Sequence, residues 1–137
     1  GDYHRIDRAG ILPLPGRQIP IWFGGFADVA FRRAAKLGDG FMLGGTVEAN
    51  LAGLEKLEGF LAEEGRSRQD FGIEAYLDFQ AGPDQWRADV EAWQAVDADY
   101  VSIRAMRMRG QYEGLGSPRE HVEALQAYWD VVSDLAD

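Results

Sequence analysis

The chain has 137 residues, of which 46% are hydrophobic and 27% charged, a composition typical of a folded globular protein and not of a disordered one. Its formal net charge of -9 argues against a nucleic-acid partner, since phosphate binding needs a basic surface. No apolar run is long enough to cross a membrane, and the absence of cysteine excludes disulfides and thiolate chemistry.

The first 18 residues differ from the rest of the chain. They contain Pro13 and Pro15 and show no hydrophobic periodicity, so we predict a long loop over residues 1–18 that leads into the first strand. We expect residues 19–137 to form the folded part. The N-terminus has no apolar core of a signal peptide, and a cytoplasmic location is our default expectation.

Two strand-to-helix units follow this loop. The first apolar run, Ile19–Phe23, ends at Gly24-Gly25 and precedes a helical pattern over residues 27–37. The second run, Gly40–Leu43, ends at Gly44-Gly45-Thr46, and Thr46 is a plausible N-cap for a longer helix that Gly65 ends. Each unit thus places a pair of glycines between a strand and a helix.

Two further units complete the pattern. Apolar residues alternate along Phe71–Phe79, with Glu74, Tyr76 and Asp78 on the other face, and Pro83 suits the start of the next helix. The fourth run, Asp99–Met106, is followed by a predicted loop over residues 107–116. Ser117-Pro118 then has the sequence of an N-cap and first helical residue.

The predicted order is therefore β-α repeated four times. Strict alternation favours a parallel sheet with right-handed crossovers. Four such units form either a small open α/β sheet or half of a (β/α)8 barrel, which typically has about 250 residues. Composition and periodicity leave both possibilities open.

Three segments resemble the luciferase-like monooxygenase family of flavin- and deazaflavin-dependent oxidoreductases. Arg17–Gly25, RQIPIWFGG, resembles the family's R-P-I-P-I-W-x-G-G signature. Ala30–Phe41, AFRRAAKLGDGF, is similar to A-L-R-R-A-A-R-L-G-D-G-W, and Gly1–His4 resembles a segment that precedes the family's fifth strand. The resemblance is strongest over residues 19–45 and covers almost the whole chain.

This resemblance implies that the chain is the C-terminal half of a TIM barrel, with four parallel βα units. The first four units of the barrel would then lie outside this chain, and we expect the chain by itself to be inactive. Open strand edges need cover, so we expect a homodimer or pairing with a complementary half-barrel. The implied cofactor is FMN or a deazaflavin coenzyme, and the implied substrate is a small molecule.

The two glycine-rich turns are the candidate cofactor site. Glycine permits close backbone approach to a ligand, and the following helix N-terminus offers free N–H groups to a phosphate. In the resembling family, the loops after these two strands help to hold the cofactor phosphate. The expected contact residues are Gly24, Gly25, Phe26, Ala27, Gly44, Gly45 and Thr46. The simpler alternative is a pair of tight turns that bind nothing.

Other polar residues carry weaker signals. Arg104, at the end of the fourth run, is expected either to pair with Glu74 or Asp78 inside the barrel or to meet an anion. The two histidines, His4 and His121, have no metal-site spacing, so we predict no metal. No catalytic residue is assigned. The remaining large aromatics are expected in the core, namely Trp22, Trp86, Trp93 and Trp129.

Three functions follow from these patterns. The first is a portion of a flavin- or deazaflavin-dependent oxidoreductase, in which the cofactor supplies the redox chemistry. The second is a catalytically inactive half-barrel that self-associates as a structural or binding module. The third is an unrelated open α/β domain, which a spatial strand order other than 1-2-3-4 would support.

Overall fold

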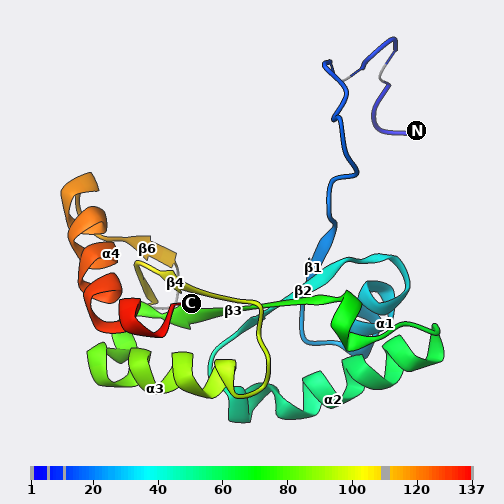
Figure 1. Cartoon of the computed structure of the whole chain (residues 1–137). Helices are drawn as coiled ribbons and strands as arrows, with labels where there is room; N and C mark the ends of the chain where they lie inside the picture. Colours follow the sequence, from blue (N-terminus) through cyan, green and yellow to red (C-terminus); the bar gives the residue numbers. More distant parts are fainter. Residues whose placement is uncertain (1, 6, 11, 109–111, 137) are drawn as a thin grey trace.

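The computed structural model describes residues 2–5, 7–10, 12–108 and 112–136, with residues 107, 108, 112 and 113 described by their backbone alone. Four strands alternate with four helices along the chain (Figure 1). The strands are β1 (Trp22–Gly24), β2 (Gly40–Gly44), β3 (Gly72–Asp78) and β4 (Tyr100–Arg104). The helices are α1 (Asp28–Leu37), α2 (Val47–Glu63), α3 (Pro83–Gln94) and α4 (Pro118–Val132), and short 3-10 turns η1 (Arg68–Asp70), η2 (Phe79–Ala81) and η3 (Ser133–Leu135) complete the elements.

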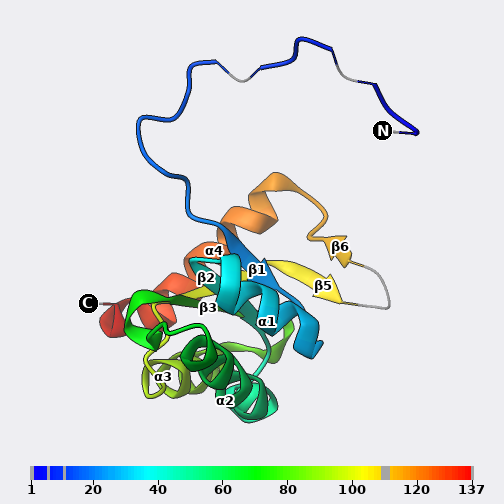
Figure 2. The same ribbon diagram turned by 90° about the vertical axis from the view of Figure 1, so that its right-hand side faces the viewer.

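The four strands form one parallel sheet in the order β1-β2-β3-β4. This order decides between the two architectures that the sequence left open. A self-sufficient open sheet would carry helices on both faces, whereas the helices here pack on a single face of the arc (Figures 1 and 2). The α/β prediction of four parallel units, half of a TIM barrel, is confirmed.

The two faces of the sheet differ in burial. Along β3, Ile73, Ala75 and Leu77 are almost fully buried beneath the helices, as the predicted alternation requires. Phe41 and Leu43 of β2 continue this buried face. The opposite face carries Met42, Glu74, Tyr76, Tyr100 and Ser102, which are half-buried or exposed. That face would be the inside of a complete barrel.

The core lies between the sheet and the helices. Each helix contributes large side chains to it, with Phe31 stacked on Phe41 at 4.8 Å and Trp93 completely buried. Burying an aromatic or aliphatic side chain of this size contributes about 1.5–3 kcal/mol. Neighbouring helices contact one another in chain order. Burial of Trp86 and Trp93 is as predicted.

Two tryptophans contradict the prediction that all four are in the core. Trp22 is half-buried on the open face of the sheet, over Gly40 and Gly72. The second is Trp129. It lies on α4 but is 52% exposed, because α4 is the last helix of the arc and no described element covers its outer flank. Val122 and Leu125 share this exposed flank. Helical periodicity correctly identified an apolar stripe on this helix. It does not show whether a neighbouring helix or strand covers the stripe.

The first strand and the loop after β4 also differ from expectation. Ile19 and Ile21 are exposed and precede β1, whose ladder starts at Trp22 because its partner β2 starts at Gly40. The fourth run, predicted to reach Met106, ends as β4 at Arg104. Met106 begins β5 (Met106–Met108), which continues into the predicted loop and pairs antiparallel with β6 (Tyr112–Gly114). We predicted a loop because this segment is rich in glycine and arginine, and this composition does not indicate the two short strands. Residues 109–111 lie outside the described residues.

The N-terminal segment contains no helix or strand among its described residues before Trp22, and it runs away from the sheet (Figure 2). This arrangement agrees with the loop expected over residues 1–18, although the division at residue 19 stays a prediction. None of the described helices has the length and apolar character needed to cross a membrane.

An ion pair joins α3 to the end of the chain and makes stability depend on pH. The Arg87 guanidinium donates to both carboxylate oxygens of Asp134 at 2.8 Å, and these hydrogen bonds lower the pKa of Asp134 from its usual 3.8. The stabilisation is present above pH 3.8 and is lost as pH falls through the lowered folded pKa. We expect Asp134→Asn to lower the free energy of unfolding slightly at neutral pH, with the difference shrinking in acid. Urea titrations of both proteins across this range test it.

Candidate functional site

The carboxyl ends of the four strands meet at one edge of the sheet. β1 ends at Gly24, β2 at Gly44, β3 at Asp78 and β4 at Arg104, and all four run parallel. In (β/α)8 barrels the active site lies at this edge, in the loops that follow the strands. Both glycine-rich turns predicted from the sequence are at this edge, on adjacent strands.

The turn after β1 is open and exposed. Gly25 has φ +132°, a backbone conformation that favours glycine, and its missing Cβ would lie 3.1 Å from Cβ of Ala30. Ala27 is the N-cap of α1 and supplies no side-chain hydrogen bond. Phe26 is 81% exposed. Asp28, in the first helical turn, is paired with Lys56 at 2.8 Å, which partly offsets its negative charge.

The turn after β2 is more ordered by hydrogen bonds. Gly45 has φ +95°. Among the described residues, the one atom within 4 Å of its missing Cβ is Nδ2 of Asn50 at 4.0 Å, so space is open beside its Cα. Thr46 is the predicted N-cap, and its hydroxyl accepts a hydrogen bond from the Ala49 N–H at 3.3 Å. The Gly45 N–H donates to the carbonyl of Tyr76 at 3.3 Å, which ties the turn to β3.

Two buried side chains that sequence analysis missed hold this second turn. Asn50, on α2 and 6% exposed, donates from Nδ2 to the carbonyls of Gly44 at 2.9 Å and Thr46 at 2.8 Å. Trp93, on α3, donates from Nε1 to the carbonyl of Gly45 at 3.1 Å. A buried amide is costly unless it is hydrogen-bonded. The one signal for Asn50 in the sequence is a polar residue on the apolar stripe of α2.

Tyr76 of β3 and Arg104 of β4 lie beside the second turn, on the open face of the sheet. The Tyr76 ring packs against Cα of Gly44, where a side chain would have no room. The Arg104 guanidinium lies 4.4 Å from the centre of this ring. Ser102 donates to the Glu74 carboxylate at 3.0 Å, and Asp78 accepts from the Gln80 N–H. An ion pair of Arg104 with Glu74 or Asp78 stays a prediction.

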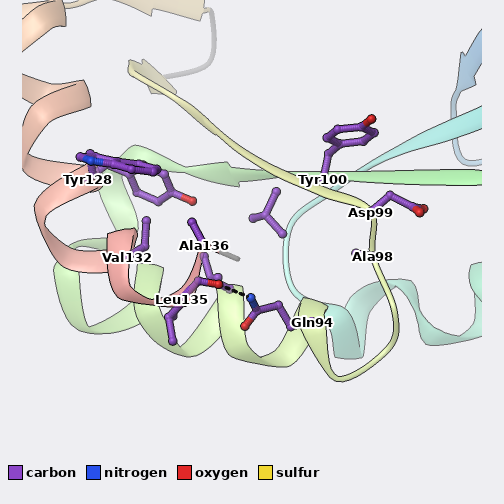
Figure 3. Close-up of a pocket in the computed structure, with 11 residues that line it drawn as sticks. Gln94, Ala98, Asp99, Tyr100, Tyr128, Val132, Leu135 and Ala136 are labelled. Atoms are coloured by element: carbon purple, nitrogen blue, oxygen red, sulfur yellow. Dashed lines mark hydrogen bonds between the residues drawn. The ribbon is translucent and has the colours of Figure 1, made fainter.

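A cavity that is partly open to solvent lies at the other end of the sheet, where the strands begin. It has a volume of about 260 Å³ between α3, the start of β4 and the C-terminal end of α4 (Figure 3). Its walls are mostly apolar, and a hydrogen bond from Gln94 Nε2 to the carbonyl of Leu135 crosses one side. Because Asp99 and Tyr100 line it at the amino-terminal end of β4, we assign it to packing rather than to the active site.

Among the described residues, no group of three His, Asp or Glu side chains is arranged to bind a metal ion. His121 is half-buried near the start of α4, with Nε2 close to Gly114. The candidate site at the carboxyl ends of the strands combines backbone groups of the glycine turns and helix N-termini with the nearby Arg104 guanidinium.

Comparison with known sequences identifies the family. Residues 1–134 match the sequence profile of the family described as luciferase-like monooxygenase. The chain belongs to this family. Uncharacterized proteins of Mycobacterium tuberculosis and Mycobacterium bovis are 36% identical to this luciferase-like chain over 72 residues. That match covers 53% of the chain and 23% of each relative, so it spans less than a quarter of their length.

Luciferase-like proteins generally bind flavin-type cofactors. The predicted contact residues lie in two places on one edge: Gly24, Gly25, Phe26 and Ala27 after β1, and Gly44, Gly45 and Thr46 after β2. Their contact with a cofactor stays a prediction.

Proposed function

We propose that this luciferase-like chain is part of a flavin- or deazaflavin-dependent oxidoreductase and holds the phosphate of its cofactor. The phosphate would lie against the turns Gly24–Ala27 and Gly44–Thr46. The main support for this proposal is the arrangement of the two glycine turns. Each contains a glycine with positive φ, follows one of two adjacent parallel strands and leads directly into a helix N-terminus.

The turn after β2 fits a phosphate group. Its three consecutive carbonyls are occupied by protein donors, so the turn does not present them to an anion. The open space beside Gly45 would admit phosphate oxygens close to the backbone. The exposed Phe26, in the turn after β1, offers an apolar surface to a larger part of the same ligand.

The bound cofactor would supply the redox chemistry. This chain's residues would bind and orient it: the turns through backbone N–H groups, and Arg104 through a positive charge on the open face. No nucleophile or metal ligand is required of the described residues. The small-molecule substrate and the residues that touch it stay unassigned.

FMN and riboflavin separate phosphate binding from ring binding, because they differ only in the phosphate. The proposal predicts that the chain quenches FMN fluorescence at concentrations where riboflavin is unaffected, and that inorganic phosphate competes. Equal affinity for the two flavins would contradict the phosphate site. The same titration with a deazaflavin coenzyme shows whether the chain binds a flavin or a deazaflavin more tightly.

Glu48 provides a milder test of the same site. Its carboxylate lies in the first turn of α2, exposed and close to the proposed phosphate. Removing a like charge at a helix N-terminus changes binding by about 0.3–1 kcal/mol, since such exposed charges are screened. We expect Glu48→Gln to tighten FMN binding by about twofold to fivefold at low salt. Glu58→Gln, on the same helix but far from the turn, is the control.

A second candidate function rests on the two outermost strands of the sheet, whose outer sides are unpaired in the described sheet. β1 and β4 are the outermost strands of the described sheet, and apolar side chains are exposed at both ends of the arc. These are Val29 and Leu37 on α1, and Val122, Leu125 and Trp129 on α4. Unpaired strand edges promote association, so we propose a homodimer in which two arcs pair edge to edge.

Sedimentation equilibrium tests this association. A dimer that dissociates on Trp129→Glu supports edge pairing between two copies. A monomer that dimerises only with a separately supplied half-barrel would favour a complementary partner over self-association. A monomer under all these conditions would contradict the association and leave the cofactor proposal to its own test.

A further inference from the structure

We infer that Asn50 and Trp93 are positioning residues that hold the carbonyls of the Gly44–Thr46 turn inward and thereby point the N–H groups of Thr46 and Val47 outward. The inference builds on the proposed function, since the outward N–H groups are the proposed phosphate donors. Neither residue would touch the ligand. Each acts through the backbone, from helices that pack behind the turn.

The hydrogen bonds fix three successive peptide groups. Asn50 Nδ2 reaches the carbonyls of Gly44 and Thr46 at 2.9 Å and 2.8 Å, and Trp93 Nε1 reaches the carbonyl of Gly45 at 3.1 Å. Both donors are buried, with exposed fractions of 6% and 0%. The carbonyls therefore point into the protein, towards α2 and α3.

Because the carbonyls point inward, peptide geometry sets the direction of the backbone N–H groups that follow them. In a planar trans peptide, the C=O of one residue and the N–H of the next point in opposite directions. Inward carbonyls on Gly45 and Thr46 therefore send the N–H groups of Thr46 and Val47 outward. The carbonyl of Gly44 belongs to the peptide whose N–H, on Gly45, is used in the bond to Tyr76.

The turn after β1 has no comparable support. Its N-cap, Ala27, makes no side-chain cap, whereas Thr46 caps α2 through its hydroxyl. The two glycine turns are therefore not equivalent. The second is pre-organised, which lowers the ordering cost of binding.

Loss of the Asn50 amide would affect the carbonyl of Gly44 most. That carbonyl would lose the Asn50 hydrogen bond, and an unsatisfied polar group inside the protein is costly. The carbonyl of Thr46, as the N-cap, keeps the intrahelical bond that an N-cap carbonyl accepts. We expect the turn to rotate and hydrate the Gly44 carbonyl, which moves the N–H groups of Thr46 and Val47 away from the site.

The chain offers a matched control for the experiment. Trp93→Phe keeps a buried ring but removes the hydrogen bond to the Gly45 carbonyl. Trp86→Phe, on the same helix and 3% exposed, removes the equivalent indole bonds to the carbonyls of Asp78 and Phe79. Both variants lose an indole N–H from a strand-to-helix turn, but only the first affects the proposed site. Asn50→Leu removes the other donor while filling its volume.

Residual dipolar couplings of the N–H vectors of Thr46 and Val47 measure the orientation directly, and titration with inorganic phosphate measures its consequence. We expect Trp93→Phe and Asn50→Leu to rotate these vectors and to weaken phosphate binding at least about fivefold. Trp86→Phe should leave both unchanged, whatever its effect on thermal stability.

The outcomes separate the two proposals. Unchanged couplings in both Trp93→Phe and Asn50→Leu would overturn the positioning role, as would wild-type phosphate affinity in both. If the wild-type chain binds no phosphate, the proposed function fails, while the couplings still decide whether these residues orient the turn. Should Asn50→Leu not fold, Trp93→Phe alone gives the same test.

Discussion

Gly45→Asp is expected to weaken FMN binding by about 100-fold or more. The new carboxylate would point into the open space beside the turn, within a few ångströms of the proposed phosphate. Like charges about 4 Å apart near a protein surface repel by up to about 4 kcal/mol before screening by salt. Fluorescence titration with FMN in low and moderate salt measures the loss, which should shrink as salt increases.

Two controls separate charge from backbone strain. Gly45→Asn places a neutral side chain of the same shape at φ +95° and should lose far less affinity than Gly45→Asp. Gly65→Asp puts the same acid at φ +70° beyond the other end of α2, with nothing within 4 Å, and should bind FMN like the wild type. If Gly45→Asn and Gly45→Asp bind FMN equally, electrostatic repulsion is not the cause.

Gly72→Ala is expected to destabilise the fold by about 1–3 kcal/mol, a typical cost of overpacking. The Trp22 indole lies flat across β2 and β3 on the open face, above Gly40 and Gly72, which share its register. A methyl group at Gly72 would lie 2.5 Å from Cη2 of Trp22. The ring would have to leave this position and its edge-to-face contact with Tyr100 at 5.9 Å.

Gly59→Ala is the matched control for this prediction. Gly59 lies in the C-terminal half of α2, and no described atom lies within 4 Å of its missing Cβ, so alanine should stabilise the helix by about 0.5–1 kcal/mol. The double variant Gly72→Ala/Trp22→Leu should recover most of the loss, because a smaller side chain vacates the space. Additive losses in the double variant would mean that the ring and the methyl group do not compete.

Much of the fold was predictable because local signals agreed with the tertiary structure. Alternation along β3 identified its buried face, and Thr46 and Ser117 were correctly placed as N-caps. Ser117 even forms a capping box with Glu120. Alternating strands and helices of regular length leave little freedom in a parallel sheet, so the strand order followed from the pattern and the family resemblance together.

What sequence patterns did not reveal depends on which segments meet in space. Trp129 lies on a regular apolar stripe, yet the arc ends at α4 and leaves it exposed. β5 and β6 are three residues each, too short for a periodic signal. In both cases the deciding factor is the presence or absence of a neighbouring strand or helix, which local periodicity does not encode.

The candidate site was predictable only in part, for the same reason. Glycine pairs after two strands are visible in the sequence, and the structure places them side by side. Asn50, Trp93 and Tyr76 reach the second turn through tertiary packing from α2, α3 and β3. Their role depends on helix rotation and strand register, which set the positions of individual atoms.

Amide NMR titration with FMN, and with riboflavin alongside, maps where the phosphate binds on the chain. We expect FMN to shift the backbone N–H signals of Thr46 and Val47, with smaller shifts near Gly25, and riboflavin to leave them unchanged. Shifts centred instead on the cavity around Tyr128 and Leu135, or identical shifts with both flavins, would contradict a phosphate site at the carboxyl edge of the sheet.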